Sequence, residues 1–290
     1  MDIQSTTLGG QGSTETFQQD HLAVLMDVRR TYRRTDEELA PRTGLGWVNS
    51  LGLSADDLPP GIEKCNTKPN REALFRMVAD RQQDTMALCA TIFAWGGMHV
   101  RHGRELFRAG TRWRGTAETV RFGNITRAEA YALFHKLRAD GALPGMGPAY
   151  FTKLVFFLRG SDVADPGYIM DQWTGCSVNL LTGDPCTVLM NANYTWIRPT
   201  TLRSDFQVSD KNDARRYGHF CSIIDDIASM VSLDPVDAEL LLMSQGRGRG
   251  AWRRHVQAHR QAPSIASSQQ VVMSLSDVDD VGDERQRQKP

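Results

Sequence analysis

The stretch LPGMGPAYFTKLVFFLRG, residues 143–160, decides which fold this sequence predicts. Its Pro-Gly-Met-Gly segment ends a helix, because glycine adopts backbone conformations that other residues disfavour. Pro148 then favours the first turn of a new helix. Upstream, Thr126 followed by Glu129 is typical of a capping box, which starts a helix. The sequence therefore predicts a helical hairpin over residues 126–160.

The turn of this hairpin is predicted to hold a DNA phosphate. Glycine carries no Cβ atom, so a ligand can approach the backbone closely. The first N–H groups of the following helix have no partner within the helix and favour an anion. A monovalent cation bound by loop carbonyls is the one cofactor that the turn suggests. An ordinary corner with a glycine cap explains the same pattern, and both interpretations stay open. The predicted DNA-binding residues are Gly145, Met146, Gly147, Tyr150, Thr152 and Lys153.

A candidate catalytic carboxylate follows the second helix of the hairpin, in the segment DPGYIMDQWTG. Asp171 stands at the end of an apolar run, beside Met170 and Trp173. A carboxylate in such surroundings is poorly solvated and needs a partner or a chemical task. Asp171 can also cap the helix that follows it. We expect it to lie beside the hairpin and to be the catalytic acid.

Composition and charge bound the class of protein. The chain has 290 residues, of which 40% are hydrophobic and 23% charged, and its net charge is zero. It lacks a run of 18 apolar residues and the pattern of a signal peptide, so a soluble cytoplasmic monomer is expected. Arginine supplies 28 of the 34 basic residues. Basic stretches at 95–121 and 247–260 predict a face that binds anions.

The predicted architecture is mainly α, in one domain of residues 18–261 that consists of two packed helical subdomains with a cleft between them. Residues 1–17 and 262–290 are polar and aperiodic, which is typical of disordered segments. Only two segments look strand-like, and they form a short β excursion after Asp171. Those segments are 185–191 and 194–199. The further predicted helices are 21–34, 71–97, 213–231 and 235–246.

The cysteines and histidines do not favour a metal site. The five cysteines are odd in number and widely spaced, and no C-x-x-C motif occurs, so reduced and mostly buried thiols are expected. His99 and His102 have helical spacing but lack a third ligand with matching spacing. Capping or surface roles explain the two histidines better than a metal does.

The hairpin and the aspartate together resemble the helix-hairpin-helix DNA glycosylase superfamily, whose signature is L-P-G-x-G followed by an essential aspartate. The resemblance runs from about Trp95 to Ser244 and includes the closing segment RRYGHFCSIIDDIASMVSLDPVDAELLLMS. The segments AWGGM, GMGPAYFTKLVFFL and YIMD are similar to a bacterial branch with an 8-oxoguanine-glycosylase fold. One kind in that branch removes glucosylated hydroxymethylcytosine from phage DNA.

The resemblance implies a glycosylase that flips a modified base out of double-stranded DNA, at the bacterial nucleoid. Asp171 then stabilises the positive charge that grows on the sugar and orients the attacking water. Bifunctional members carry a Schiff-base lysine two residues after the second hairpin glycine, where this chain has Ala149. This departure favours a monofunctional enzyme that leaves an abasic site. Lys153 lies one turn further and is the second catalytic candidate.

Three tryptophans are candidates for the walls of the base pocket. They are Trp95, Trp173 and Trp196. Aromatic walls suit an extruded base, which stacks between apolar side chains. A core position explains each single tryptophan better than a place in the pocket wall does. Two other functions stay open: an 8-oxoguanine repair glycosylase and lyase that uses Lys153, and a non-catalytic module that only binds DNA.

Overall fold

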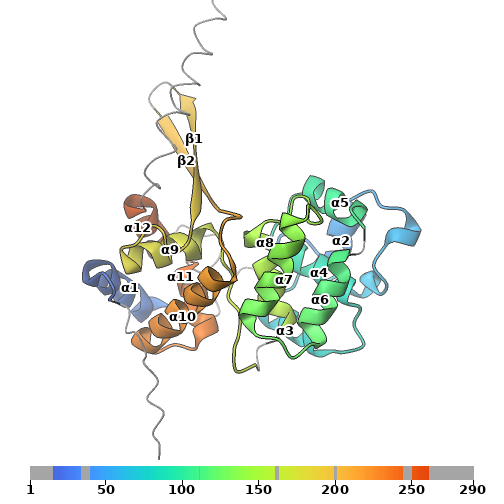
Figure 1. Cartoon of the computed structure of the whole chain (residues 1–290), viewed down its shortest axis with the longest axis horizontal. Coiled ribbons are helices and arrows are strands. Elements are labelled where there is room, and N and C mark those ends of the chain that lie inside the picture. Colours follow the sequence, from blue (N-terminus) through green and yellow to red (C-terminus); the bar gives the residue numbers. More distant parts are fainter. Residues whose placement is uncertain are drawn as a thin grey trace, which may run out of the picture.

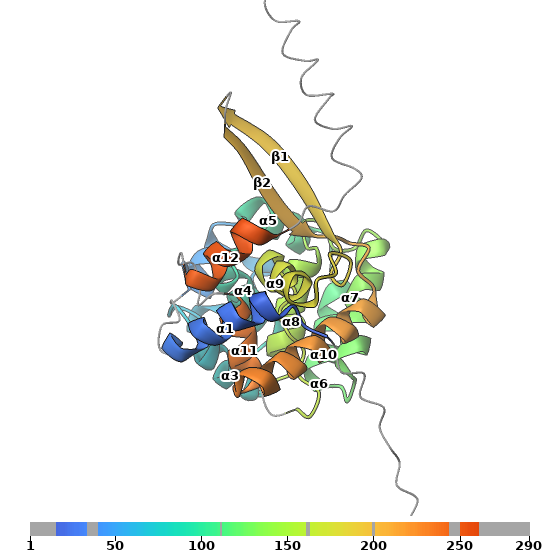
Figure 2. The ribbon, with the colours of Figure 1, turned by 90° about the vertical axis from the view of Figure 1, so that its left-hand side faces the viewer.

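The protein is mainly helical, as predicted, and its helices form two groups beside each other (Figure 1). The computed structural model describes residues 16–33, 40–110, 112–160, 163–198, 201–243 and 250–260, and it leaves the side chains of 193–204 undescribed. Helices α2 to α8 make one group. The other contains α9 to α12 together with α1 from the start of the chain (Figures 1 and 2).

The elements follow each other in a simple order. The first group contains α2 (Gly44–Asn49), α3 (Arg71–Ala79), α4 (Thr85–Trp95), α5 (Val100–Arg108), α6 (Arg112–Phe122), α7 (Arg127–Ala139) and α8 (Pro148–Leu158), with short 3-10 turns at Ala55–Asp57 and Ile62–Lys64. The second contains α1 (Gln19–Thr31), α9 (Gln172–Thr182), α10 (Ala214–Val231), α11 (Pro235–Leu242) and α12 (Ala251–His259). Strands β1 (Met190–Arg198) and β2 (Thr201–Val208) follow α9.

The helical hairpin forms where the sequence predicts it. The Thr126 side chain accepts from the Glu129 N–H and the Glu129 carboxylate accepts from the Thr126 N–H, so the capping box is complete. Pro148 occupies the first turn of α8. The α8 helix is buried along most of its length, because apolar residues surround it on nearly every side. It therefore forms a fixed support beside the turn.

The expected helix over 71–97 is two helices. α3 ends at Ala79, and α4 begins at Thr85 after a short turn. Asp84 starts α4, because its Oδ1 accepts from the N–H groups of Met86 and Ala87 at 2.8 and 3.1 Å. The prediction of one continuous helix was therefore wrong. The polar segment 80–84 marks the break between the two helices, and the spacing of the apolar residues did not reveal it.

The β excursion is one long hairpin, and its strands differ from the predicted ones. β1 and β2 pair antiparallel, with Asn191 opposite Gln207 and Ala192 opposite Phe206. The first predicted segment, 185–191, is mostly loop. The second, 194–199, lies almost wholly within β1, and its partner strand at 201–208 was not predicted. Phe206 and Val208 are buried at alternate positions, as a strand with one face on the core requires. The hairpin projects beyond the helices (Figure 2).

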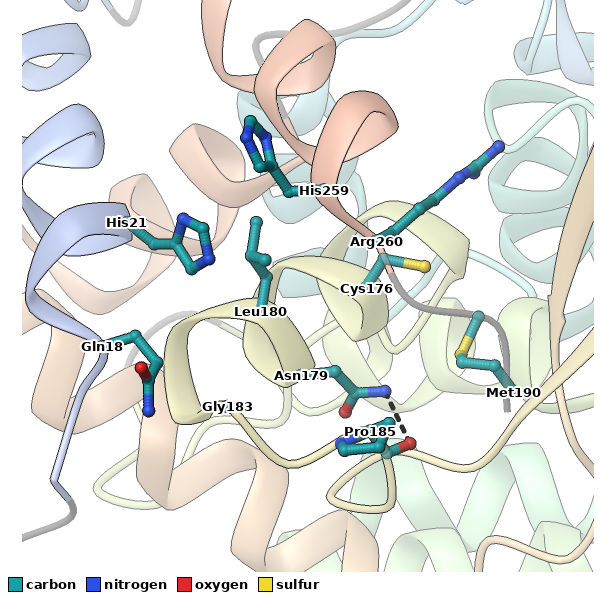
Figure 3. Close-up of a pocket in the computed structure, with 10 residues that line it drawn as sticks. All are labelled: Gln18, His21, Cys176, Asn179, Leu180, Gly183, Pro185, Met190, His259 and Arg260. Carbon is teal, nitrogen blue, oxygen red and sulfur yellow. Dashed lines mark hydrogen bonds between the residues drawn. The ribbon is translucent and has the colours of Figure 1, made fainter. Parts of the chain in front are cut away.

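Helices α1 and α12 come from opposite ends of the chain and lie side by side (Figures 1 and 2). His21 Nδ1 and His255 Nε2 are 3.0 Å apart, and the His259 ring centroid lies 4.2 Å from that of His255. Figure 3 shows His21 and His259 on either side of Leu180, around a cavity of about 170 Å³. Phe17 is also buried, so the ordered fold begins before the predicted start at residue 18.

We expect this histidine cluster to make the fold less stable in mild acid. Burial is the main cause that lowers the pKa of His21 and of His255 from 6.5, and the positive charge of His259 lowers both further, while Asp20 opposes the effect at His21. The unfolded chain then binds protons more readily than the folded one, so stability falls as pH drops below about 6.5. The melting temperature should decline between pH 7.5 and 5.5. The double variant His21→Gln/His255→Gln should flatten this dependence, whereas His135→Gln, outside the cluster, should keep it.

Three of the six arginines in the first basic stretch make contacts that hold the fold together. Arg114 pairs with Asp84 and Glu118, and Arg121 donates to four backbone or hydroxyl oxygens. Arg104 donates to the Leu51 carbonyl at 2.6 Å. Arg101, Arg108 and Arg112 are exposed, so the anion-binding face stays a prediction for these three residues. The cysteines are unpaired, as expected: four are buried and Cys186 is exposed. The two terminal segments predicted as disordered lie almost wholly outside the described residues.

Candidate active site

A cleft of about 590 Å³ brings the hairpin turn and Asp171 together. Its lining combines the turn and start of α8 with the start of α9 and the base of the β-hairpin. The residues are Gly96, His102, Arg138, Gly145, Gly147, Pro148, Ala149, Tyr150, Lys153, Asp171, Gln172, Asn191, Phe206, Gln207, Val208 and Asp210. Of the predicted site residues, Gly145, Gly147, Tyr150, Lys153 and Asp171 therefore share one cleft.

Asp171 is the N-cap of α9 and is partly exposed to the cleft. Its Oδ1 accepts from the N–H groups of Trp173 and Thr174 at 2.8 and 3.2 Å. Within the described part of the chain, no hydrogen bond is donated to its other oxygen, Oδ2. One oxygen thus fixes the carboxylate on the positive end of the α9 dipole, and the other is available to a ligand in the cleft.

The segment before Asp171 is held from two sides. The Tyr217 hydroxyl accepts from the Tyr168 N–H at 3.0 Å and donates to the Tyr168 carbonyl at 2.9 Å. The Thr152 hydroxyl, on α8, accepts from the Met170 N–H at 3.1 Å. Because α8 also carries the hairpin glycines at its start, this bond ties the position of Asp171 to the hairpin.

Lys153 is a buried cation in the cleft, with only 7% of its surface exposed. Its Nζ donates to the Ala149 carbonyl at 2.6 Å and lies 5.3 Å from the centroid of the Tyr150 ring. Burial lowers the pKa of the Lys153 ammonium, while the charges of Asp171 and Glu239 oppose that shift. The ammonium therefore stands in the electrostatic field of Asp171.

A buried ion pair lies behind Lys153. The Arg71 guanidinium contacts the Glu239 carboxylate and lies over the rings of Trp95 and Phe156, 5.5 and 5.2 Å from their centroids. Burial raises the pKa of Glu239, against the lowering effect of Arg71. Glu239 Oε1 is buried and accepts no hydrogen bond from the described residues. Four charged residues thus influence one another here, namely Asp171, Lys153, Glu239 and Arg71. No local sequence pattern indicated this group.

The hairpin turn packs closely against α5. Gly145 has a φ of +69°, and a Cβ atom there would stand 2.7 Å from the Cβ of His102. Glycine is therefore required both by conformation and by space. The close neighbour of Gly145 is a protein side chain, which differs from the predicted role of leaving room for a ligand. His102 Nδ1 is buried without a hydrogen-bond partner in the described structure.

A carboxylate and a guanidinium lie on the other side of the turn. Arg138 donates to Asp210 Oδ2 at 2.9 Å and to the Leu143 carbonyl at 2.8 Å. Asp210 Oδ1 would stand 3.4 Å from a Cβ on Gly147. A phosphate at this turn would thus meet a carboxylate whose charge Arg138 already balances. The loop carbonyl of Leu143, one of those suggested for a monovalent cation, is occupied by the Arg138 guanidinium.

Several predicted residues lie away from the cleft surface. Met146 and Thr152 are fully buried, so neither side chain reaches a DNA strand in this conformation. Trp95 packs edge-on against Phe157, and Trp173 lies under Arg253; neither is among the lining residues. Trp196 is on β1, and its side chain is outside the described structure. The aromatic walls that do line the cleft are Tyr150 and Phe206.

Sequence patterns did not indicate several lining residues. Phe206, Asn191 and Gln207 reach the cleft through the β-hairpin, and Arg138 and Asp210 through a contact between α7 and the loop after β2. The alternation of Phe206 and Val208 is too short to distinguish the second strand from a loop by sequence alone. Across the described residues, no cluster of three or more His, Cys, Asp or Glu side chains could hold a metal ion, and no helix is long and apolar enough to cross a membrane.

Comparison with known protein families assigns most of the chain to one family. Residues 31–243 match the family described as "Putative 8-oxoguanine DNA glycosylase OGG-like protein". No curated protein and no solved structure matches the chain. The matched region holds the helical hairpin, Lys153 and Asp171, and it ends before α12. The chain therefore belongs to the OGG-like family of DNA glycosylases, which cleave N-glycosyl bonds in DNA.

Proposed function

We propose that this glycosylase is monofunctional and that Asp171 is its catalytic carboxylate. The observation that supports this most is the cleft itself, in which the carboxylate and the hairpin turn face the same space. Cleavage of an N-glycosyl bond builds positive charge on the sugar, as in other glycoside hydrolysis. Asp171 Oδ2 stabilises that charge and orients the attacking water, while the two N–H bonds to Oδ1 keep the carboxylate in place.

The cleft accepts a base that has left the stack. Its volume of about 590 Å³ lies within the range of about 300–1,000 Å³ that is usual for ligand pockets. Phe206 and Tyr150 offer aromatic surface on which a base can stack. The hairpin turn and the Ala149 N–H at the start of α8, to which the described structure gives no acceptor, hold a backbone phosphate beside the target nucleotide. The enzyme then releases the base and leaves an abasic site.

The proposed substrate is a bulky modified base, and glucosylated hydroxymethylcytosine is the one to test first. The support is the similarity of GMGPAYFTKLVFFL and YIMD to the bacterial branch that contains such an activity, together with the volume of the cleft. An enzyme for this base acts against phage DNA. A smaller oxidised purine would leave part of the cleft unfilled.

The purified protein should create alkali-labile sites in DNA that carries glucosylated hydroxymethylcytosine. Duplexes with 8-oxoguanine and with unmodified bases serve as the matched comparison, and the readout is strand scission before and after alkali. Scission only after alkali is expected, since a monofunctional enzyme leaves the backbone intact. Release of 8-oxoguanine alone would replace the proposed substrate, and intact DNA in every duplex would contradict catalysis altogether.

One observation favours a second candidate, the combined glycosylase and lyase. Lys153 lies in the cleft, in the electrostatic field of Asp171, and burial lowers the pKa of its ammonium. A desolvated lysine is a better nucleophile towards the sugar than an exposed one. Its bond to the Ala149 carbonyl instead fits a fixed cation. The monofunctional reading stays first, because the position that bears the Schiff-base lysine in bifunctional relatives is alanine here.

A further inference from the structure

The last helix, α12, lies outside the matched family region and yet contacts the wall of the cleft. The Arg253 guanidinium lies 4.3 Å from the centroid of the Trp173 ring. Arg260 lies 5.7 Å from the same centroid and 4.2 Å from that of Phe206. Arginine stacks favourably on aromatic faces. Arg253 of α12 and Arg260, the C-cap residue of the same helix, therefore cover Trp173 in the first turn of α9 and Phe206 on β2.

From these aromatic residues a short series of contacts leads to Asp171. With its carboxamide oriented to satisfy both partners, Gln172 donates to the Phe206 carbonyl at 2.8 Å and accepts from Trp173 Nε1 at 3.1 Å. The backbone N–H of Trp173 is itself one of the two N–H groups that donate to Asp171 Oδ1. Gln172 and Phe206 line the cleft. A shift of Trp173 or Phe206 would therefore move the N–H group that orients the carboxylate.

Helix α12 is a fixed part of the fold. Trp252 is fully buried, and its Nε1 donates to Ser177 Oγ on α9 at 2.9 Å. Arg253 Nη2 donates to the Met243 carbonyl at 2.8 Å. Figure 3 shows His259 facing the small cavity beside His21, while the Arg260 side chain extends away from both histidines. Other residues thus anchor the helix, and Arg260 contacts the aromatic pair.

We propose that Arg253 and Arg260 are positioning residues for the glycosylase reaction, acting through Trp173, Phe206 and Gln172 on the carboxylate of Asp171. This inference rests on the function proposed for Asp171. Neither arginine lines the cleft. They therefore affect the carboxylate only through the residues that lie between them and Asp171. Because α12 begins after residue 243, where the family match ends, these two positioning residues lie outside the matched region.

The test compares single variants that each lose one charge. Arg260→Gln and Arg253→Gln remove a stacking cation, whereas Arg254→Gln removes the charge of an exposed neighbour on the same helix and is the matched control. We expect kcat for base release to fall about tenfold in the first two, because small displacements of catalytic groups are costly. KM for DNA should change no more than in Arg254→Gln. Arg260→Lys, which keeps the cation, should recover part of kcat.

A second measurement is independent of activity. Cys176 is 3% exposed and interacts with Arg260, while Cys186 is exposed. Alkylation mapped by mass spectrometry should therefore become faster at Cys176 in Arg260→Gln, with Cys186 as internal standard. An active enzyme whose kcat is unchanged in both stacking variants would overturn the inference, and so would unchanged alkylation. If the wild type releases no base and Arg260→Gln still shows the faster alkylation of Cys176, the proposed function is contradicted instead.

Discussion

Asp171→Asn should release the target base about a thousandfold more slowly than the wild type, the loss expected when one preorganised charge leaves an active site. Asparagine is nearly the same size and caps helices as well as aspartate does. Its side-chain oxygen can still accept from the N–H groups of Trp173 and Thr174, so the start of α9 should keep its conformation. The variant therefore removes the charge that the growing cation on the sugar needs, and little else. Single-turnover base release is the measurement.

A second capping aspartate provides the control. Asp213 is the N-cap of α10, and its Oδ1 accepts from the Arg216 N–H at 2.8 Å, but it does not line the cleft. Asp213→Asn removes the same charge from the same kind of position. Both variants should bind DNA equally well, and only Asp171→Asn should lose activity. Equal rates of base release in the two variants would show that the carboxylate of residue 171 is not the catalytic group.

The parts of the fold that the sequence predicts well depend on neighbours in the chain. Thr126 and Glu129 form the capping box within a single turn of helix, and Pro148 starts α8 by its own fixed φ. Asp171 caps α9 through N–H groups only two and three residues away. Such contacts form whatever the rest of the fold does, and a single sequence therefore reveals them.

The remaining features depend on contacts between distant segments. Arg71 pairs with Glu239, which lies 168 residues further along the chain. The sequence around neither residue indicates that its charge is buried. The wall formed by Phe206 exists because β2 returns to α9, and periodicity could not distinguish that polar strand from a loop. Trp95 was a candidate for the base pocket on residue type alone, and its packing against Phe157 instead fits the alternative, a position at the core.

Lys153→Gln is expected to slow base release by about a hundredfold, with little change in DNA affinity. The ammonium balances Asp171 and Glu239 in a region from which water is largely excluded. Glutamine keeps a polar group of similar reach but loses the positive charge, so the carboxylates repel each other more strongly. Thermal unfolding should show a loss of stability as well, because Glu239 is fully buried. Base release measured below the melting temperature of the variant separates the two effects.

Borohydride trapping tells the two roles of Lys153 apart. If the residue acts as a fixed cation, the wild type should form no covalent adduct with DNA, and Lys153→Gln should differ only in rate. If the residue is a nucleophile, borohydride should trap an adduct with the wild type that Lys153→Gln does not form, and strand scission should then occur without alkali. Lys136→Gln, which removes an exposed lysine of α7 outside the cleft, is the matched control. A wild-type adduct lost only in Lys153→Gln would replace the monofunctional mechanism, because the amine would then bond to the sugar itself.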